Sequence, residues 1–259
     1  MKYFFCLFYF IICSISAQET IETKLLSKIE VKADSIIGID SFKTLFFIKN
    51  NTLIKQQEGI NLKYSNLQLG NITSANTFNP LKINLFYKAF NTVIILDNRL
   101  AEIFKVDFNT LKAYKNVTHV ATGSDNTIWI FNQNLQQLEL YDYKANHIRA
   151  KTLPISSQVI DLTSNYNSCW LVTKDFIYQY NYTGSLISKI ENIGFTSIKE
   201  SDENIILKKE NTLYLIREKS KKIQKINLPN LLINQFLVTN QILYIYTDGF
   251  LHEYQIKPK

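Results

Sequence analysis

The sequence predicts an all-β fold: a β-propeller of six blades built from antiparallel strands. Three observations predict it. A strand–turn–strand pattern recurs about every forty residues, its turns are rich in Asn and Asp, and helical periodicity is almost absent. Four short strands in each repeat of this length are typical of a propeller blade. An open β-sandwich and a pair of barrels are the alternatives that the same strands leave open.

The repeat unit is a short apolar run, a polar turn and an aliphatic residue that opens the next strand. In the first copy the run is Leu45–Ile48, the turn is Lys49–Thr52 and the aliphatic residue is Leu53. Six aliphatic residues mark the copies at intervals of 47, 35, 42, 36 and 38 residues: Leu53, Leu100, Leu135, Ile177, Leu213 and Leu251. Six copies predict six blades, although the long first interval leaves five or seven open.

The apolar runs before the turns are continuous rather than alternating, which predicts strands buried on both faces between neighbouring sheets. They are Leu45–Ile48, Val93–Leu96, Ile128–Phe131, Cys169–Val172, Ile205–Leu207 and Leu243–Tyr246. A further strand precedes most copies, at Ile36–Ile39, Val117–Val120, Val159–Leu162 and Phe195–Ile198. The turns carry Asn and Asp, which tolerate the positive φ of tight hairpins. The strands after the turns are more polar and are predicted to lie nearer the rim.

The two ends of the domain are predicted to meet. The last copy has room for about three strands, because only Lys257–Lys259 follow Tyr254–Ile256. Lys24–Val31, ahead of the first copy, is a spare strand. As the outer strand of the last blade it would close the ring and remove an open sheet edge.

Residues 1–17 are predicted to be a secretory signal peptide. Lys2 supplies the positive charge, Tyr3–Ile12 is almost entirely apolar, and Ser14–Ala17 offers a small residue at the cleavage point. A retained anchor is the weaker alternative, because about 12 apolar residues fall short of the roughly 20 that a spanning helix needs. We therefore expect an exported protein with a single propeller domain over residues 18–259 and without a transmembrane segment in the mature chain.

The charge of the chain is mildly basic. The formal net charge is +7 and becomes +6 without Lys2. One dense basic group comprises Arg217, Lys219, Lys221, Lys222 and Lys225. A solvated hairpin is the plainer interpretation, and contact with an acidic partner or with lipid head groups is the other. Export argues against a nucleic-acid partner.

The usual catalytic motifs are absent. There is no His-Glu-x-x-His, Gly-x-Ser-x-Gly, Gly-rich phosphate loop or pair of cysteines for zinc. Cys169, the cysteine outside the leader, is predicted to be a packed core thiol rather than a nucleophile. His119, His147 and His252 are assigned to three different repeats, although a propeller could bring His119 and His252 together at its axis. We predict no catalytic residue, no metal and no cofactor.

The most distinctive stretch runs from Asn79 to Leu100. Pro80 fixes its own φ and pushes Asn79 into an extended conformation, so the pair is predicted to lead rigidly into a strand over Lys82–Phe86. Either this is a well-packed blade with an ordered loop, or it is a preformed surface on which a partner docks. On the second interpretation the residues predicted to contact the partner are Asn79, Pro80, Lys82, Tyr87 and Arg99.

This stretch resembles a known group of proteins. The runs Asn79–Ile83, Phe90–Thr92 and Ile95–Leu100 are similar to small exported propeller proteins of Bacteroidota, in particular the PorD-type periplasmic accessory subunits of the type IX secretion translocon. The resemblance implies a non-enzymatic scaffold in the periplasm, peripheral to the outer membrane, with protein partners in an outer-membrane-associated complex. Cargo of that system carries a C-terminal sorting domain, whereas Tyr246–Lys259 continues the sixth repeat. The chain therefore resembles resident machinery more than cargo.

A second function class stays open. A propeller can bind or hydrolyse a glycan or small molecule at the mouth of its central channel. That function predicts acidic residues, His or Arg converging on the axis from several blades, whereas an axis of Ser, Thr, Asn and aliphatic side chains would argue against an enzyme.

Overall fold

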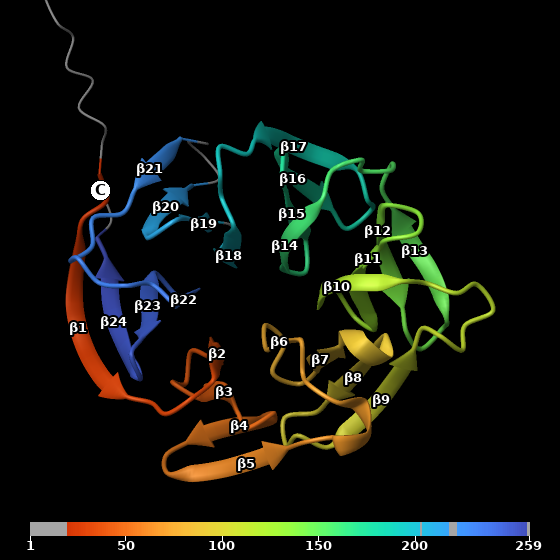
Figure 1. Cartoon of the computed structure of the whole chain (residues 1–259), viewed down its shortest axis with the longest axis horizontal. Helices are drawn as coiled ribbons and strands as arrows, with labels where there is room; N and C mark the ends of the chain where they lie inside the picture. The colour runs from red at the N-terminus through yellow and green to blue at the C-terminus, as the bar shows by residue number, and fades with distance from the viewer. Residues whose placement is uncertain (1–19, 203, 218–221, 258–259) are drawn as a thin grey trace, which may run out of the picture.

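The computed structural model describes residues 20–202, 204–217 and 222–257, and it contains six four-stranded antiparallel sheets arranged around a central axis (Figure 1). The predicted six-bladed propeller is confirmed. The predicted leader, residues 1–17, and Lys219 and Lys221 of the basic group lie outside the described residues.

The blades follow one another along the chain, and the strands of each blade run in chain order from the innermost to the outer edge. Blade 1 contains β2 (Ser35–Ile39), β3 (Leu45–Lys49), β4 (Thr52–Gln57) and β5 (Ile60–Tyr64). Blade 2 contains β6 (Ser74–Asn76), β7 (Ile83–Tyr87), β8 (Thr92–Leu96) and β9 (Glu102–Asp107). Blade 3 contains β10 (Val117–Thr122), β11 (Thr127–Asn132), β12 (Gln137–Asp142) and β13 (His147–Lys151).

The second half repeats this order, except that the outermost strand of blade 6 comes from the start of the chain. Blade 4 contains β14 (Val159–Ser164), β15 (Ser168–Thr173), β16 (Phe176–Asn181) and β17 (Leu186–Glu191). Blade 5 contains β18 (Ser197–Ser201), β19 (Asn204–Lys209), β20 (Thr212–Ile216) and β21 (Ile223–Lys225). Blade 6 contains β22 (Gln235–Thr239), β23 (Ile242–Thr247), β24 (Phe250–Ile256) and β1 (Thr23–Glu30). Two short 3₁₀ helices, η1 (Leu67–Leu69) and η2 (Lys88–Phe90), complete the described elements, and no described helix is long and apolar enough to cross a membrane.

The propeller closes through the N-terminal strand, as predicted. β1 pairs antiparallel with β24, from Thr23 opposite Ile256 to Glu30 opposite Phe250. Just before β1, Ile21 forms a parallel bridge with Ile226, at the outer edge of blade 5. The start of the chain therefore joins blade 6 to blade 5 as well as completing its own sheet.

The aliphatic markers need a correction in two blades. The second residue of the third strand is buried in every blade: Leu53, Val93, Leu138, Ile177, Leu213 and Leu251. The marker in blade 2 is therefore Val93 rather than Leu100, because the run Val93–Leu96 forms the third strand and not the second. In blade 3 it is Leu138, whereas Leu135 lies in the preceding turn and is 53% exposed. The corrected intervals are 40, 45, 39, 36 and 38 residues.

The hydrophobic core lies between blades rather than inside one. One cluster, for example, joins Phe86 and Val93 of blade 2 to Ile128 and Ile130 of blade 3. Five of the six predicted apolar runs form second strands and the run in blade 2 forms a third strand, and every residue of β7, β8 and β11 is buried. The prediction for Cys169 is confirmed, because it is 0% exposed in such a cluster, where burial raises the pKa of its thiol.

The strand order gives the disc two distinct faces. One face, which we call the connection face, carries the connections that lead from each blade to the next. They comprise residues 31–34, 65–73, 108–116, 152–158, 192–196 and 226–234. The opposite face carries the turns between the first and second strands and between the third and fourth strands of each blade. These positions follow from the alternating direction of antiparallel strands.

The innermost strands are tied to one another around the channel. Asp161 on β14 accepts hydrogen bonds from Ser197 Oγ (2.8 Å) and from the Ile198 amide (2.9 Å) on β18. Gln235 on β22 accepts one from the Ile36 amide (2.8 Å) on β2. Between blades 1 and 2 the contact is steric: a Cβ added at Gly38 would lie 2.1 Å from Thr77 Oγ1, so only glycine lets the strands approach this closely.

Candidate functional site

The residues predicted to contact a partner separate into two groups. Asn79, Pro80 and Lys82 lie in the β6–β7 turn, and Arg99 lies in the β8–β9 turn, so the structure brings these four to the opposite face of blade 2. Tyr87 ends β7 near the connection face and is 0% exposed. The prediction that Tyr87 contacts a partner is therefore wrong, because the continuous apolar strand that it ends packs on both sides.

The Asn79–Lys82 turn is ordered in the way its sequence suggests. Asn79 Oδ1 accepts a hydrogen bond from the Leu81 amide (3.0 Å), and the Asn79 carbonyl accepts one from the Lys82 amide (3.0 Å). An Asn side chain bonded to the backbone two residues ahead is a common way of fixing a turn. This turn leads into β7 and places Pro80 at the channel mouth.

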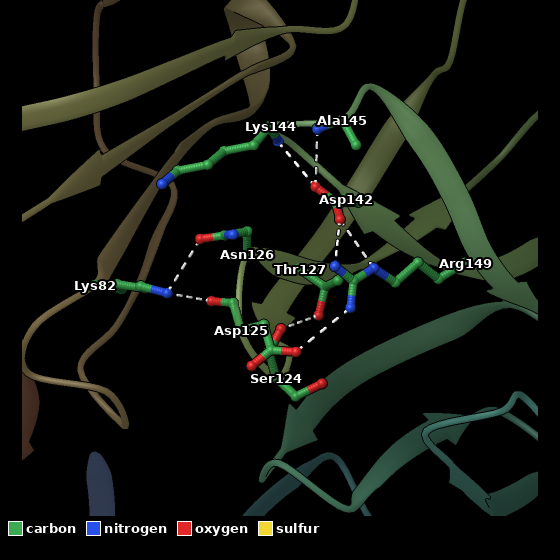
Figure 2. Close-up of polar contacts among 9 residues, drawn as sticks. All are labelled: Lys82, Ser124, Asp125, Asn126, Thr127, Asp142, Lys144, Ala145 and Arg149. Carbon is green, nitrogen blue, oxygen red and sulfur yellow. Dashed lines mark hydrogen bonds and ion pairs between the residues drawn. The ribbon is translucent and has the colours of Figure 1, made fainter.

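Lys82 holds two blades together. Figure 2 shows its side chain reaching the β10–β11 turn of blade 3, where Nζ donates to the Asp125 carbonyl and to Asn126 Oδ1. Arg149 on β13 donates from Nε (2.9 Å) and Nη2 (2.5 Å) to Asp142 Oδ2, and its Nη1 lies 3.4 Å from Asp125 Oδ2. The ammonium group of Lys82 is thus engaged in the contact between blades 2 and 3. Asn79, Pro80 and Arg99 are the remaining candidates for contact with a partner.

Asp142 sits at the centre of this network. Burial alone would raise the pKa of its carboxyl group, but hydrogen bonds from the Ala145 amide and the Arg149 guanidinium outweigh burial and hold the pKa below its usual value. Asp142 therefore stays ionised and structural at neutral pH.

The central channel contains two cavities that meet. The cavity toward the connection face has a volume of about 700 Å³, and the one toward the opposite face about 420 Å³. Both are lined by Ile37, Ser74, Ala75, Lys199 and Leu237. Ionisable groups do line the axis together with Ser, Thr, Asn and aliphatic residues, but Asp161 is engaged by its neighbours in blade 5. Acidic residues from three blades, Asp40, Asp161, Glu200 and Asp202, thus converge on the axis, as the ligand-binding alternative predicts, although Ser, Thr, Asn and aliphatic residues line it as well.

The three histidines do not converge. His119 lies on the innermost strand of blade 3, and His147 lies on the outermost strand of that same blade, so assigning them to different repeats was wrong. His252 lies on β24, the third strand of blade 6, away from the axis. In the described part of the chain, no group of His, Cys, Asp and Glu is arranged to hold a metal ion.

His119 gives a pH-dependent prediction. Burial is the largest cause that lowers its pKa from the ordinary 6.5, and Lys88 lowers it too, while Asp161 and the Ile160 backbone oppose the shift. A lowered pKa in the folded state means that the contribution of His119 is present above pH 6.5 and is lost as the pH falls through the folded pKa. Urea titrations at a series of pH values should therefore show a shallower loss of stability on acidification for His119→Gln than for the wild type. His147→Gln, at an exposed position, is the control, and identical profiles for all three proteins would contradict the prediction.

The most distinctive surface lies on the connection face. Five of the connections between successive blades each expose one large apolar side chain, and we call these five residues the apolar ring. They are Leu67 (91% exposed), Tyr114 (54%), Leu153 (85%), Ile193 (52%) and Leu232 (58%). Surface apolar residues usually occur singly, whereas a repeated set on one face indicates an interaction site.

The loops that carry the apolar ring are anchored and largely without charge. A buried apolar residue follows the exposed one in four of them: Leu69, Ile155, Phe195 and Ile233. The same four connections, residues 65–73, 152–158, 192–196 and 226–234, contain no Asp, Glu, Lys, Arg or His. Loops normally carry polar and charged residues, so the uncharged composition of these four connections indicates an apolar contact surface. It is visible in the sequence, but a prediction based on the strands does not use it.

The opposite face is different in kind. Phe78 of blade 2 and Tyr166 of blade 4 pack edge to face with ring centroids 4.9 Å apart, so these two partly cover each other. Phe42 and Leu81 are exposed there, at 79% and 62%, in separate turns. Tyr182 of blade 4 is also exposed on this face, at 58%, so among the described residues its exposed apolar side chains come from blades 1, 2 and 4 rather than one from each successive connection.

Comparison with known proteins identifies the fold. No protein-family model and no curated protein matches the chain. Among solved structures it is similar to virginiamycin B lyase from Staphylococcus aureus, with 12% identity and a TM-score of 0.62 over 85% of this chain and 80% of that chain. It is also similar to a chain of a mitotic checkpoint complex (11% identity, TM-score 0.58, 100% and 98% coverage) and to the Pan2 WD40 domain of Neurospora crassa (8% identity, TM-score 0.57, 88% and 76% coverage). At these identities the likeness shows the propeller fold alone.

Proposed function

We propose that this protein is a non-enzymatic docking scaffold whose apolar ring binds an apolar surface of a protein partner. The observation that carries the proposal is the apolar ring itself: one exposed apolar side chain on each of five successive connections, in loops that mostly carry no charge. Burying such side chains against a partner removes apolar area from water, which is the main driving force of protein association. The absence of charge in the loops means that little desolvation cost opposes it.

The loops of the propeller are held in a fixed position, which suits a docking role. The anchors Leu69, Ile155, Phe195 and Ile233 fix each loop to the core, so the exposed residues are held in place before a partner arrives. Preorganised contacts lose less conformational entropy on binding and therefore bind more tightly. Apolar side chains spaced around one face also present several separate contact points to a broad surface, as a scaffold requires.

The compartment and the complex are finer parts of the same proposal. The predicted leader supports export to the periplasm, and the resemblance of Asn79–Leu100 supports an outer-membrane-associated complex, with the type IX secretion translocon as the specific candidate. In this arrangement the connection face meets the complex, while Asn79, Pro80 and Arg99 on the opposite face remain available to a second partner.

The test is capture of the partner by the native protein and by variants of the apolar ring. Wild-type protein purified from its own cell envelope is expected to carry a stoichiometric protein partner, and Leu67→Ser combined with Leu153→Ser to reduce the recovery of that partner. Truncating an interface hot spot costs more than ~1 kcal/mol, so two truncations should weaken binding on the order of tenfold or more. Both side chains are highly exposed, so stability should change by less than ~0.5 kcal/mol for each.

The matched control is Phe42→Ser combined with Leu81→Ser, which removes two comparably exposed apolar residues from the opposite face. This variant should retain the partner. Equal loss in both variants, or recovery of the wild type only as a free monomer, would count against the proposal. Sedimentation of the purified protein with lipid vesicles, abolished by Leu67→Ser/Leu153→Ser, would assign the apolar ring to a membrane surface instead.

A further inference from the structure

The larger channel cavity has the size and lining of a ligand site. Its volume of about 700 Å³ lies within the ~300–1,000 Å³ usual for small-molecule pockets. Aliphatic and aromatic side chains form part of the wall, among them Ile36, Ile72 and Phe236, and neutral polar groups such as Asn71, Ser74 and Asn234 form another part. This mixture fits an organic molecule better than a bare ion.

Two lysines line this cavity, and neither has an ion-pair partner among the described residues. Lys199 comes from the innermost strand of blade 5 and Lys208 from the strand beside it. Within the described part of the chain, neither ammonium group forms an ion pair. The acidic residue that lines the same cavity, Asp34, accepts a hydrogen bond of 2.6 Å from the Asn50 amide.

The carboxylates near Lys199 are already engaged. Asp161 accepts hydrogen bonds from Ser197 Oγ, the Ile198 amide and the Leu162 amide at 2.8–2.9 Å. Glu200 accepts one from Asn165 Nδ2 at 3.0 Å. These groups hold blades 4 and 5 together, so Lys199 remains a half-buried cation facing the channel without an ion-pair partner among the described residues.

The charges differ between the two ends of the channel. The cavity toward the opposite face is lined by four carboxylates: Asp40, Asp161, Glu200 and Asp202. Lys199 lines both cavities, and Lys208 lines the one toward the connection face. The cavity toward the connection face therefore has two cations against one carboxylate, Asp34, whereas four carboxylates line the far end, so an anion would be held beside Lys199 and Lys208.

We propose that this cavity binds a small organic anion whose carboxylate or phosphate group lies between Lys199 and Lys208. The uncharged part of the ligand contacts the aliphatic wall and hydrogen-bonds to the neutral polar groups. None of the five residues of the apolar ring lines this cavity, so substitutions in the apolar ring and substitutions of the two lysines test the docking proposal and this proposal separately.

The test uses three sugars of similar size that differ in charge. Isothermal titration calorimetry with glucose 6-phosphate, glucuronate and glucose separates a phosphate, a carboxylate and a neutral ligand on the same scaffold. We expect at least one of the two anions to bind at least tenfold more tightly than glucose. Lys199→Met and Lys208→Met should each weaken that binding at least tenfold, while Lys174→Met, on the connection face but outside the cavity, should leave it unchanged.

Several outcomes would overturn the proposal. They are no binding of any of the three sugars, equal affinity for glucose and both anions, and unchanged affinity in the Lys199→Met and Lys208→Met variants with their folding confirmed by circular dichroism. The docking variant Leu67→Ser/Leu153→Ser should bind the anion normally. A failure of the docking proposal and a failure of this one are therefore distinguishable.

Discussion

Replacing Lys115 with Met is expected to lower the free energy of unfolding by about 3–5 kcal/mol, the usual effect of removing one partner from a buried ion pair. Lys115 Nζ lies 2.7 Å from Glu139 Oε2, and the two side chains are 8% and 0% exposed. Methionine keeps most of the volume and removes the charge. The Glu139 carboxylate then stays buried, and among the described residues the hydrogen bond that it keeps is the one from Asn132 Nδ2, at 3.3 Å.

The surroundings of Glu139 explain why the loss is large. It lies on β12 opposite Ile130 and between Leu138 and Leu140, all of which are buried. Water cannot replace the lost ammonium group there without opening the contact between blades 2 and 3. Equilibrium unfolding in urea measures the difference from the wild type.

Two further variants separate charge from packing. Lys115→Met combined with Glu139→Leu removes both charges, and apolar replacement of a whole buried pair is often close to neutral, so most of the stability should return. Lys32→Met breaks the exposed pair with Glu30, where the side chains are 78% and 59% exposed, and should change stability by less than ~1 kcal/mol. A double variant as unstable as Lys115→Met would show that packing, rather than the unpaired charge, caused the loss.

The fold could be predicted from the sequence because each blade is local. Antiparallel strands joined by short turns leave a signal within about forty residues, and the apolar runs such as Ile128–Phe131 become the buried second strands. Closure by the N-terminal strand could also be predicted by counting strands, because the last copy lacked one strand and Lys24–Val31 belonged to no copy. The one misassigned run, Val93–Leu96, lies in blade 2, where every residue of both middle strands is buried and most are apolar, so the pattern cannot distinguish the two strands.

The candidate site could be predicted less well, because exposure depends on neighbouring blades. Tyr87 and Arg99 look equally available in the sequence, yet Tyr87 ends a strand buried on both faces and Arg99 lies in a turn. Likewise, nothing in the run Ser197–Ser201 shows that Lys199 would line the channel while Ile198 packs between blades 4 and 5. The apolar ring was accessible in principle, through the uncharged composition of four connections, but it needed the strand boundaries to be known first.

Replacing Ile21 with Ala is expected to destabilise the protein by about 2–5 kcal/mol, the range for truncating a fully buried Ile. Ile21 is 0% exposed and packs with Ile206 and Leu213 of blade 5 and with Ile245 of blade 6. Its amide donates to the Lys225 carbonyl (2.8 Å), and its carbonyl accepts from the Asn227 amide (2.8 Å). Truncation therefore leaves a cavity where the start of the chain joins blades 5 and 6.

The control for this prediction lies four residues further along. Leu25 on β1 is 50% exposed, so Leu25→Ala should cost less than ~1 kcal/mol although it is in the same closing segment. Urea unfolding of residues 18–259 measures both variants. Equal losses of unfolding free energy would show that closure of the propeller depends on the β1–β24 pairing rather than on the Ile21 side chain. The predicted cleavage after Ala17 would leave Ile21 in place, whereas a chain that starts at Thr23 lacks it and should be at least as unstable as Ile21→Ala. That comparison tests whether the closure of the propeller requires the segment just behind the predicted cleavage point.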